Sequence, residues 1–335
     1  MTITRKVGIC ASAVLSMALV GAAGNSAVAD DRSDWPRGVA IGSSTIGGNF
    51  HVFMTGWGEI LRDELDVQSR VEVTGGPVNN VKLVTSKQNE FSPVTMGIAY
   101  EGYNGEGWAD QEYPDIRVVW PMYKSLLQWW VMPDEDVNSI FDFEGKAISN
   151  GPAGSSPNLY GGRVLEMFDI NPSRIVTGQN TDVANLMRDG QLVAGAGFSG
   201  VPNPTADEMV NTEGAKIIGV PKEQAEEFAE RYGLGVDVIP GGVYKNHPDD
   251  IDTITLWSAV ITHKDMPEDF VYEVTKATFE NNDRMLEVHR SAAQSTLENV
   301  KNLKGVPFHP GALRYFEEQG VELPDSAYPP EYEKQ

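Results

Sequence analysis

The 335-residue sequence is short of cysteine, and its only one, Cys10, lies within the first 29 residues. The chain after residue 29 therefore has no thiol for a disulfide, a nucleophilic thiolate or a cysteine-bound metal. An apolar core has to stabilise it, and its length is sufficient for two lobes of roughly 150 residues each.

Positive charge is also scarce. The chain has 26 lysines and arginines against 48 aspartates and glutamates, a formal net charge of −22. Such a surface is a poor partner for nucleic acid and for anionic membranes. At ~0.15 M salt the Debye length is about 8 Å, so an acidic surface does not prevent an anion from entering a recessed cleft.

Long apolar runs are missing except near the start. Arg5 and Lys6 precede an apolar run over 11–23, and the Ala-Val-Ala triplet at 27–29 follows it. This order is typical of a cleavable secretory signal, and the run is shorter than the roughly 20 residues of a membrane span. We therefore expect a signal peptide over 1–29, cleavage before Asp30, release into the periplasm and no stable membrane insertion.

Catalytic and cofactor motifs are absent as well. No G-x-G-x-x-G or H-E-x-x-H occurs, no lysine completes a P-loop at 151–156, and "GFSGV" at 197–201 has Val201 where a nucleophile elbow needs glycine. The histidines, at 51, 247, 263, 289 and 309, form no metal-like cluster in sequence. The sequence predicts no metal, no cofactor and no enzyme, although a secreted α/β hydrolase stays open as an alternative.

A repeated unit of strand, glycine-rich turn and helix is what the sequence does contain. A strand over 39–42 precedes a helix over 51–64, and a strand over 70–73 precedes a helix over 79–87. The same unit recurs at 147–168 and at 193–209. Repetition of this kind predicts an α/β protein with largely parallel sheets.

The last third of the chain has a different pattern. Apolar residues over 267–300 follow one long helical register, and "HPGALRYFEEQG" at 309–320 predicts a final helix that starts near Pro310 and ends before Gly320. No low-complexity linker occurs. We expect lobe I over 30–125 plus 240–335 and lobe II over 126–239, joined by crossings near 121–133 and at the turn 240–242.

Four glycine-rich turns, at 42–48, 74–80, 151–158 and 197–203, each lead from a strand into a helix. The first N–H groups of a helix are unpaired and lie at its positive end, so they attract a carboxylate or a phosphate. Glycine lets a ligand approach the main chain, and serine and threonine add hydroxyl groups. Any single turn of this kind is commonly a mere connection, whereas several facing one crevice would hold a small polar anion.

Six stretches carry a family resemblance over about residues 38–321. They are "IGSSTIGGNFH" at 41–51, "VEVTGGPVNNVKLV" at 71–84, "MGIAYEGYNGEG" at 96–107, "GPAGSSPNLYGGRVLE" at 151–166, "LMRDGQLVAGAGFSGVPNP" at 186–204 and "GVPFHPGALRYFEEQG" at 305–320. Together they resemble the extracytoplasmic solute receptors of the TAXI family, the binding proteins of one class of TRAP transporters.

The resemblance implies a two-lobed, type II-like periplasmic binding protein. Each lobe would be a mixed, mostly parallel sheet flanked by helices, with the ligand cleft between the lobes. The protein would act as a monomer that captures glutamate, glutamine or a C4–C5 dicarboxylate and delivers it to TRAP membrane permease subunits. The ligand contacts implied by the matching positions are Ser43, Ser44, Thr45, Gly47, Gly48, Met96, Tyr100, Tyr123, Gly154, Ser155, Ser156, Tyr160, Val201, Pro202 and Asn203.

The chain departs from the family pattern at "MGIAY" and at "WWVMPDED", where relatives commonly have a polar and a basic residue. Backbone and hydroxyl donors should therefore provide most of the anion recognition. We expect replacement of Ser155 and Ser156 by alanine to weaken binding by about 1–3 kcal/mol. A binding protein of an ABC importer remains an alternative, because the fold and the clamp are shared.

Overall fold

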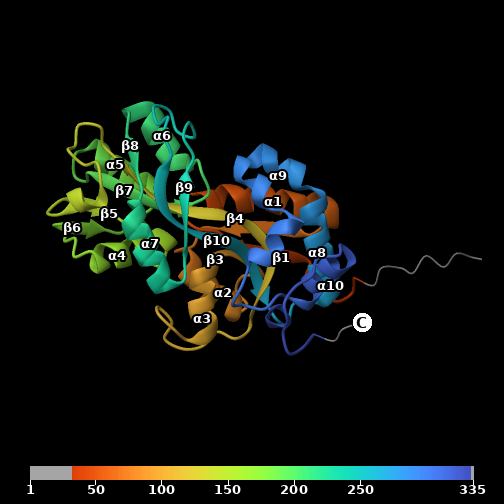
Figure 1. Cartoon of the computed structure of the whole chain (residues 1–335). Coiled ribbons are helices and arrows are strands. Elements are labelled where there is room, and N and C mark those ends of the chain that lie inside the picture. Colours follow the sequence, from red (N-terminus) through yellow and green to blue (C-terminus); the bar gives the residue numbers. More distant parts are fainter. Residues whose placement is uncertain (1–31, 333–335) are drawn as a thin grey trace, which may run out of the picture. The chain divides into compact units, whose positions relative to one another are not determined.

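A computed structural model describes residues 32–332, so the predicted signal segment at 1–29 lies outside the described residues. One compact unit begins at Trp35, and every helix and strand of the described chain belongs to it. Figure 1 shows the long strands β4 (Ile116–Val131) and β10 (Ile251–His263) crossing between two groups of helices.

The first elements confirm the predicted succession of strand, turn and helix. Each strand has five residues, and the next helix starts within a few residues of its end. These elements are β1 (Gly38–Gly42), α1 (Asn49–Leu65), β2 (Gln68–Glu72), α2 (Pro77–Thr85), β3 (Phe91–Thr95) and α3 (Met96–Asn104).

The middle of the chain repeats the unit. After β4 come η1 (Ile140–Phe143), β5 (Ala147–Ser149), α4 (Ser156–Met167), β6 (Arg174–Val176), α5 (Asn180–Arg188), β7 (Ala194–Ser199), α6 (Pro204–Glu213), β8 (Lys216–Ile218), α7 (Lys222–Tyr232) and β9 (Gly235–Ile239). Proline occupies the first turn of α2, α4 and α6, where its missing N–H costs no hydrogen bond.

The segment over 267–300, which was predicted to follow one long helical register, forms four separate helices. The prediction of a single register was wrong. Helix α8 (Glu268–Glu280) ends where the Asn281 side chain donates to the Ala277 carbonyl, and α9 (Asn282–Val288) ends at the extended His289. Two 3-10 helices, η2 (Arg290–Gln294) and η3 (Leu297–Asn302), follow. The final helix, α10 (Pro310–Glu318), starts and stops as predicted, and η4 (Asp325–Ala327) comes last.

All the strands form one ten-stranded mixed sheet in the order β2-β1-β3-β10-β4-β7-β5-β6, with β9 beside β10 and β8 beside β4. The outer groups, β2-β1-β3 and β7-β5-β6, are parallel. The central strands β10 and β4 are antiparallel to each other and to their neighbours. The predicted mixed α/β architecture is therefore confirmed, with one continuous sheet shared across the molecule.

The apolar core is divided along these two long strands. Its first part contains residues of β4 up to Tyr123 and of β10 from Ala259 onwards. The second and third parts contain β4 from Leu126 and β10 up to Ile254. Tyr244, which follows the predicted turn at 240–242, still packs in the third part.

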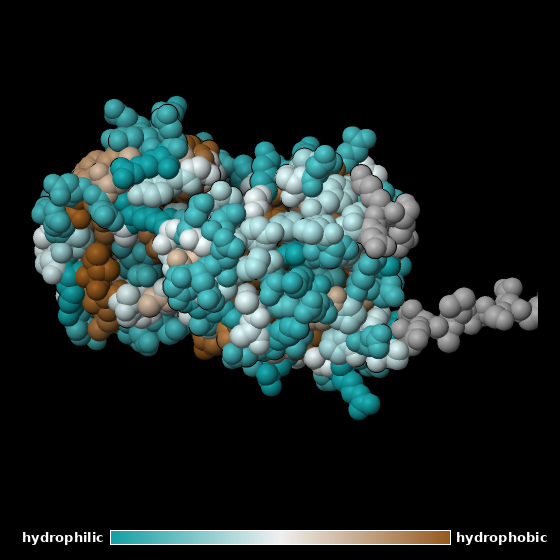
Figure 2. Space-filling view, turned by 90° about the horizontal axis from the view of Figure 1, so that it is seen from below, coloured by the Kyte–Doolittle hydropathy of each residue, from teal (hydrophilic) through white to brown (hydrophobic). Residues whose placement is uncertain are grey.

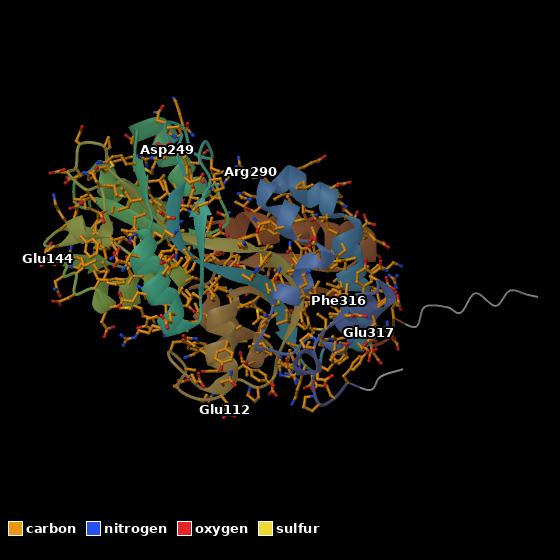
Figure 3. All side chains as sticks on the ribbon, viewed as in Figure 1. Glu112, Glu144, Asp249, Arg290, Phe316 and Glu317 are labelled. Carbon is orange, nitrogen blue, oxygen red and sulfur yellow. The ribbon has the colours of Figure 1, made fainter. Side chains whose placement is uncertain are left out.

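The surface is predominantly hydrophilic with small apolar patches, as Figure 2 shows for one face. Acidic side chains such as Glu112, Glu144, Asp249 and Glu317 lie at the periphery of the fold (Figure 3). Within the described range, no helix combines the length and apolar character that a membrane crossing requires. The excess of acid is thus carried by the outer surface, away from the buried cores.

Candidate functional site

Five helices, α1, α2, α4, α5 and α6, begin at one small cavity of about 40 Å³. Its walls come from both sides of the divided core. The lining residues are Ser44, Thr45, Gly48, Asn49, Phe50, Pro77, Pro152, Ser155, Ser156, Pro157, Asn180, Ala196, Gly197, Phe198, Ser199 and Asn203. The glycine-rich turns are therefore brought together, as the strand-and-turn pattern predicted.

The start of α1 illustrates how the sequence builds this wall. Gly47 has a φ of 80°, a backbone conformation that favours glycine, and it turns the chain so that the helix starts at Asn49. Gly48 is the N-cap and lines the cavity without a side chain. The N–H groups of Asn49 and Phe50 have no acceptor within the described part of the chain. They are available to a ligand oxygen.

Hydrogen bonds join the turns on one side of the divided core to turns on the other side. The Asn180 N–H donates to Thr45 Oγ1 at 2.9 Å, and Thr205 Oγ1 donates to the Gly47 carbonyl at 2.8 Å. The Val78 N–H donates to the carbonyl of Gly154 at 3.2 Å. These contacts fix the helix starts of the two sides against one another, and Gly47 and Gly154 act here through their main chain, outside the cavity lining.

Several predicted hydroxyl groups already have partners in the chain. Ser155 is the N-cap of α4: its Oγ accepts from the Asn158 N–H at 3.3 Å and donates to the Pro152 carbonyl at 2.6 Å. Ser156 Oγ lies 3.2 Å from Thr95 Oγ1. Ser44 Oγ, by contrast, has no partner in the described chain.

Ser43 has a structural position behind the cavity wall. Its side chain is fully buried, donates to the Glu72 carbonyl at 2.7 Å, and does not line the cavity. Its own carbonyl accepts from Thr74 and Asn80, which ties the first turn to the second. Ser43 therefore positions the turn that carries Ser44 and Thr45.

The turn before α6 contributes one of its three predicted residues. Asn203 lines the cavity, caps α6 by accepting from the Ala206 N–H at 3.1 Å, and donates to Ser199 Oγ at 3.0 Å. Val201 and Pro202, joined by a cis peptide bond, lie outside the lining. The Pro202 carbonyl accepts from His289 Nε2 at 3.0 Å, and burial lowers the pKa of His289.

Sequence reasoning missed the residues that follow the turns. Asn49 and Phe50 at the start of α1, Asn180 at the start of α5, and Phe198 and Ser199 at the end of β7 all line the cavity. Asn49 is 1% exposed; its Nδ2 donates to the Gly200 carbonyl at 2.9 Å, while its Oδ1 has no donor in the described chain. An asparagine in the first turn after a glycine-rich loop was the available signal.

Met96, Tyr100 and Tyr160 lie elsewhere, in a larger groove of about 870 Å³. Helices α3 and α7, strands β9 and β10 and the turn at Gly305 form it. Its charged lining residues are Glu101, Glu106, Lys124, Arg163, Arg231 and Lys304. These three predicted contacts therefore lie apart from those that line the small cavity.

Tyr123 lines neither space. It is fully buried, packs its ring against Phe50 and Phe53, and its hydroxyl has no partner in the described chain. Burial raises the pKa of Tyr123 well above its usual value, so the hydroxyl stays protonated. Its position behind Phe50 supports the cavity wall from the core.

A row of contacts between α3 and α4 runs from the cavity to the groove. It starts at Thr95 and Ser156, continues where the Tyr160 ring lies against Gly97, and ends in an ion pair between Glu101 and Arg163. Gly97 is required here because a Cβ at this position would overlap with Tyr160 Oη.

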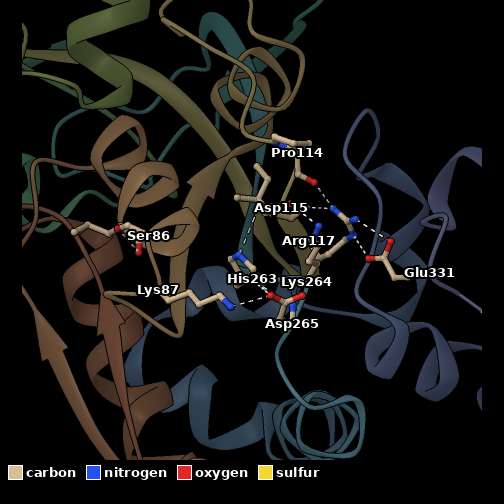
Figure 4. Close-up of polar contacts among 11 residues, drawn as sticks. Ser86, Lys87, Pro114, Asp115, Arg117, His263, Lys264, Asp265 and Glu331 are labelled. Carbon is tan, nitrogen blue, oxygen red and sulfur yellow. Dashed lines mark hydrogen bonds and ion pairs between the residues drawn. The ribbon is translucent and has the colours of Figure 1, made fainter.

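A polar cluster far from the cavity has a structural explanation. Arg117 makes two hydrogen bonds to the Glu331 carboxylate, at 2.6 and 3.0 Å, and Lys87 pairs with Asp265 at 2.8 Å (Figure 4). Burial lowers the pKa of the neighbouring His263. The described residues contain no group of three or more histidine, cysteine or acidic side chains arranged to hold a metal ion. The cluster fixes the C-terminal segment to β4.

The fold is that of the type II periplasmic binding proteins. The structure resembles that of the periplasmic binding protein BugD with a TM-score of 0.52 and 14% identity, over 85% of this chain and 98% of that one. It also resembles an ancestral arginine-binding protein bound to arginine, with a TM-score of 0.50 and 11% identity, over 76% of this chain and 97% of that one.

The family follows from the sequence itself. A model of the NMT1-like family matches residues 41–320, and the chain belongs to this family. The family match and the fold support a role in solute binding. The matched range includes all the helix starts around the cavity.

Proposed function

We propose that this protein is an extracytoplasmic solute receptor that captures a small carboxylate in the cavity where the five helices begin. The observation that carries the proposal is the convergence of these helix starts from both sides of the divided core. Each helix N-terminus stabilises a nearby anion by about 0.3–2 kcal/mol before side chains contribute.

The proposed recognition uses neutral donors. The main-chain N–H groups of Asn49 and Phe50 and the hydroxyl of Ser44 have no partner in the described chain and lie at the cavity. A carboxylate has two oxygens with about four acceptor positions, so it matches several converging donors. This chemistry needs no metal and no arginine at the anion.

Ligand capture would involve two lobes that close by bending at β4 and β10. Lobe I would contain the first part of the core, and lobe II would contain the second and third parts. The division of the core favours 30–125 plus about 255–335 for lobe I, which moves the second boundary from 240 into β10. The hydrogen bonds between Thr45 and Asn180 and between Gly47 and Thr205 would then hold the closed form.

The delivery partner is proposed from the sequence resemblance. Six stretches match the TAXI family in its order, which favours the membrane permease subunits of a TRAP transporter as the partner. The protein would meet these subunits after its export to the periplasm. The resemblance makes glutamate, glutamine and C4–C5 dicarboxylates the first ligands to test. The alternative is an ABC importer, which would use the same fold and clamp.

A thermal unfolding screen of the mature chain tests ligand capture. A ligand that binds only the folded protein adds about 2.7 kcal/mol of stability at 100 times its Kd. The panel should contain glutamate, glutamine, succinate and small monocarboxylates, each beside its uncharged amide. Stabilisation by a carboxylate but not by its amide supports the proposal, and equal effects of both would contradict it.

Uptake into proteoliposomes that contain the membrane subunits tests the partner. The TRAP proposal expects uptake that needs this protein and an ion gradient but no ATP. Uptake that requires ATP hydrolysis would assign the protein to an ABC importer and leave ligand capture intact.

A further inference from the structure

The cavity wall is uncharged. None of the described residues that line it is aspartate, glutamate, lysine, arginine or histidine, although the chain as a whole carries a net charge of −22. Ligand charge must therefore be matched by dipoles and hydrogen bonds. This condition restricts the class of solute that the cavity accepts.

The electrostatic potential in the cavity favours anions and opposes cations. Each helix N-terminus is equivalent to roughly half a positive charge, and five such ends meet here. An ammonium group would lose its hydration shell without gaining a carboxylate partner, which is unfavourable in a buried site. An α-amino acid would bring such a group, whereas a hydroxy acid would not.

Asn49 adds a requirement for a donor on the ligand. The residue lines the cavity, its side chain is 1% exposed, and its Oδ1 has no donor in the described chain. The bond from Nδ2 to the Gly200 carbonyl fixes the orientation of the amide, so Oδ1 cannot exchange places with the nitrogen without losing that bond. A buried acceptor of this kind is satisfied by a neutral O–H group.

The size of the cavity favours a short ligand. Its volume is only about 40 Å³, far smaller than the groove of about 870 Å³. Phe50 and Phe198 form an apolar part of the wall that suits a short hydrocarbon segment. The second carboxylate of glutamate would find no cationic partner among the residues that line the cavity.

We propose that the ligand is a short 2-hydroxymonocarboxylate of two to four carbons. Its carboxylate accepts hydrogen bonds from the main chain at the start of α1 and from Ser44 Oγ, and its hydroxyl donates to Asn49 Oδ1. This inference rests on the proposed function and narrows its ligand class from carboxylates in general. It places amino acids and dicarboxylates outside that class.

Titration calorimetry with three compounds that differ only at C2 tests the inference. They are 2-hydroxypropionate, propionate and 2-aminopropionate, with succinate and glutamate added for size. We expect 2-hydroxypropionate to bind most tightly, propionate to bind about tenfold or more weakly, and the amino acid at least a hundredfold more weakly. Succinate and glutamate should give no measurable heat of binding.

Two variants separate the role of Asn49 from folding. Asn49→Ser should reduce the preference for 2-hydroxypropionate over propionate to threefold or less, and Asn49→Asp should abolish binding of both acids. Asn79→Ala, an exposed asparagine in the first turn of α2, serves as the matched control and should bind as the unchanged chain does. Circular dichroism and the unfolding midpoint establish that each variant is folded.

The outcomes distinguish this inference from the proposed function. Equal or tighter binding of 2-aminopropionate, succinate or glutamate would overturn the inference while carboxylate capture stands. Equal binding of propionate and 2-hydroxypropionate would remove the role of Asn49. If none of these acids, nor any other carboxylate in the thermal screen, binds the folded protein, both proposals fail together.

Discussion

Arg163 on α4 forms a bidentate ion pair with Glu101 on α3, with N–O distances of 2.5 and 2.9 Å. Both side chains are 15% exposed, and the guanidinium also lies over the rings of Tyr160 and Tyr232. Burial by itself would lower the pKa of Arg163, but the Glu101 carboxylate outweighs it and raises the pKa. The pair therefore joins α3 to α4 with both charges retained.

Glu101→Gln should lower the free energy of unfolding by about 1–3 kcal/mol. The Arg163 guanidinium would remain desolvated but would lose its counter-charge. Because the pair is more buried than a surface ion pair and less buried than a core one, the expected loss lies between those of the two kinds. Urea denaturation measures the change. Glu106→Gln, an exposed carboxylate of the same groove, is the control and should stay within about 0.5 kcal/mol of the unchanged chain. A similar loss in both variants would refute a specific role for the pair.

Gly97→Ala should destabilise the protein by about 1–3 kcal/mol, because its Cβ would overlap with Tyr160 Oη. Adding Tyr160→Phe removes the hydroxyl oxygen and should restore part of the loss. Gly162→Ala on α4 is the control, since nothing lies within 4 Å of a Cβ at that position. Thermal unfolding of the four proteins checks this, and a double variant no more stable than Gly97→Ala would contradict it.

Ser155→Ala should cost about 1 kcal/mol of stability, because the side chain caps α4. Ser155→Asn should recover most of this loss, since asparagine is a good N-cap. The expected effect of Ser155 on ligand affinity is then indirect, through the position of the α4 start, and stability should change even without ligand. Chemical denaturation without ligand decides the point, and an unchanged midpoint in Ser155→Ala would show that the cap has no energetic role.

Stability should fall as the pH drops from about 6.5 to 4 because of His309. The ring is buried at the start of α10, its Nδ1 accepts from the Gly311 N–H, and burial lowers its pKa to about 4. The unfolded chain therefore binds a proton in this range while the folded protein does not, which removes up to about 3 kcal/mol as the pH falls.

His309→Asn keeps a capping side chain without a titrating group. Its free energy of unfolding should therefore depend less on pH between 6.5 and 4 than that of the unchanged chain. Urea denaturation at several pH values makes the comparison. Parallel pH profiles for the two proteins would mean that His309 does not contribute.

The local units of the fold were predictable because each is encoded within about twenty residues. The strand at 39–42, its glycine turn and the helix that follows are one example. The long strands β4 and β10 were not, since β4 is buried along almost its entire length and shows no alternation of polar and apolar residues. Their pairing, which joins both halves into one sheet, depends on residues more than a hundred positions apart.

The sequence predicted that the turns before the helices would meet at a polar site, but it predicted only some of the residues that line the cavity. Ser44, Thr45, Gly48, Ser155, Ser156 and Asn203 line it as expected from their turns. Asn49 and Phe198 were missed because a position in a helix or at a strand end does not reveal which side faces a ligand. Tyr160 was predicted at the ligand site but lines the groove. Its position depends on the contacts between α3 and α4, which form only when the two helices pack.

A crystal structure of the mature protein with 2-hydroxypropionate tests the central claim most directly. We predict the carboxylate in the cavity, with its oxygens within hydrogen-bond distance of the N–H groups of Asn49 and Phe50 and close to the starts of helices from both lobes. A carboxylate bound instead in the larger groove, beside Arg231 and Lys304, would contradict the claim that converging helix starts hold the ligand.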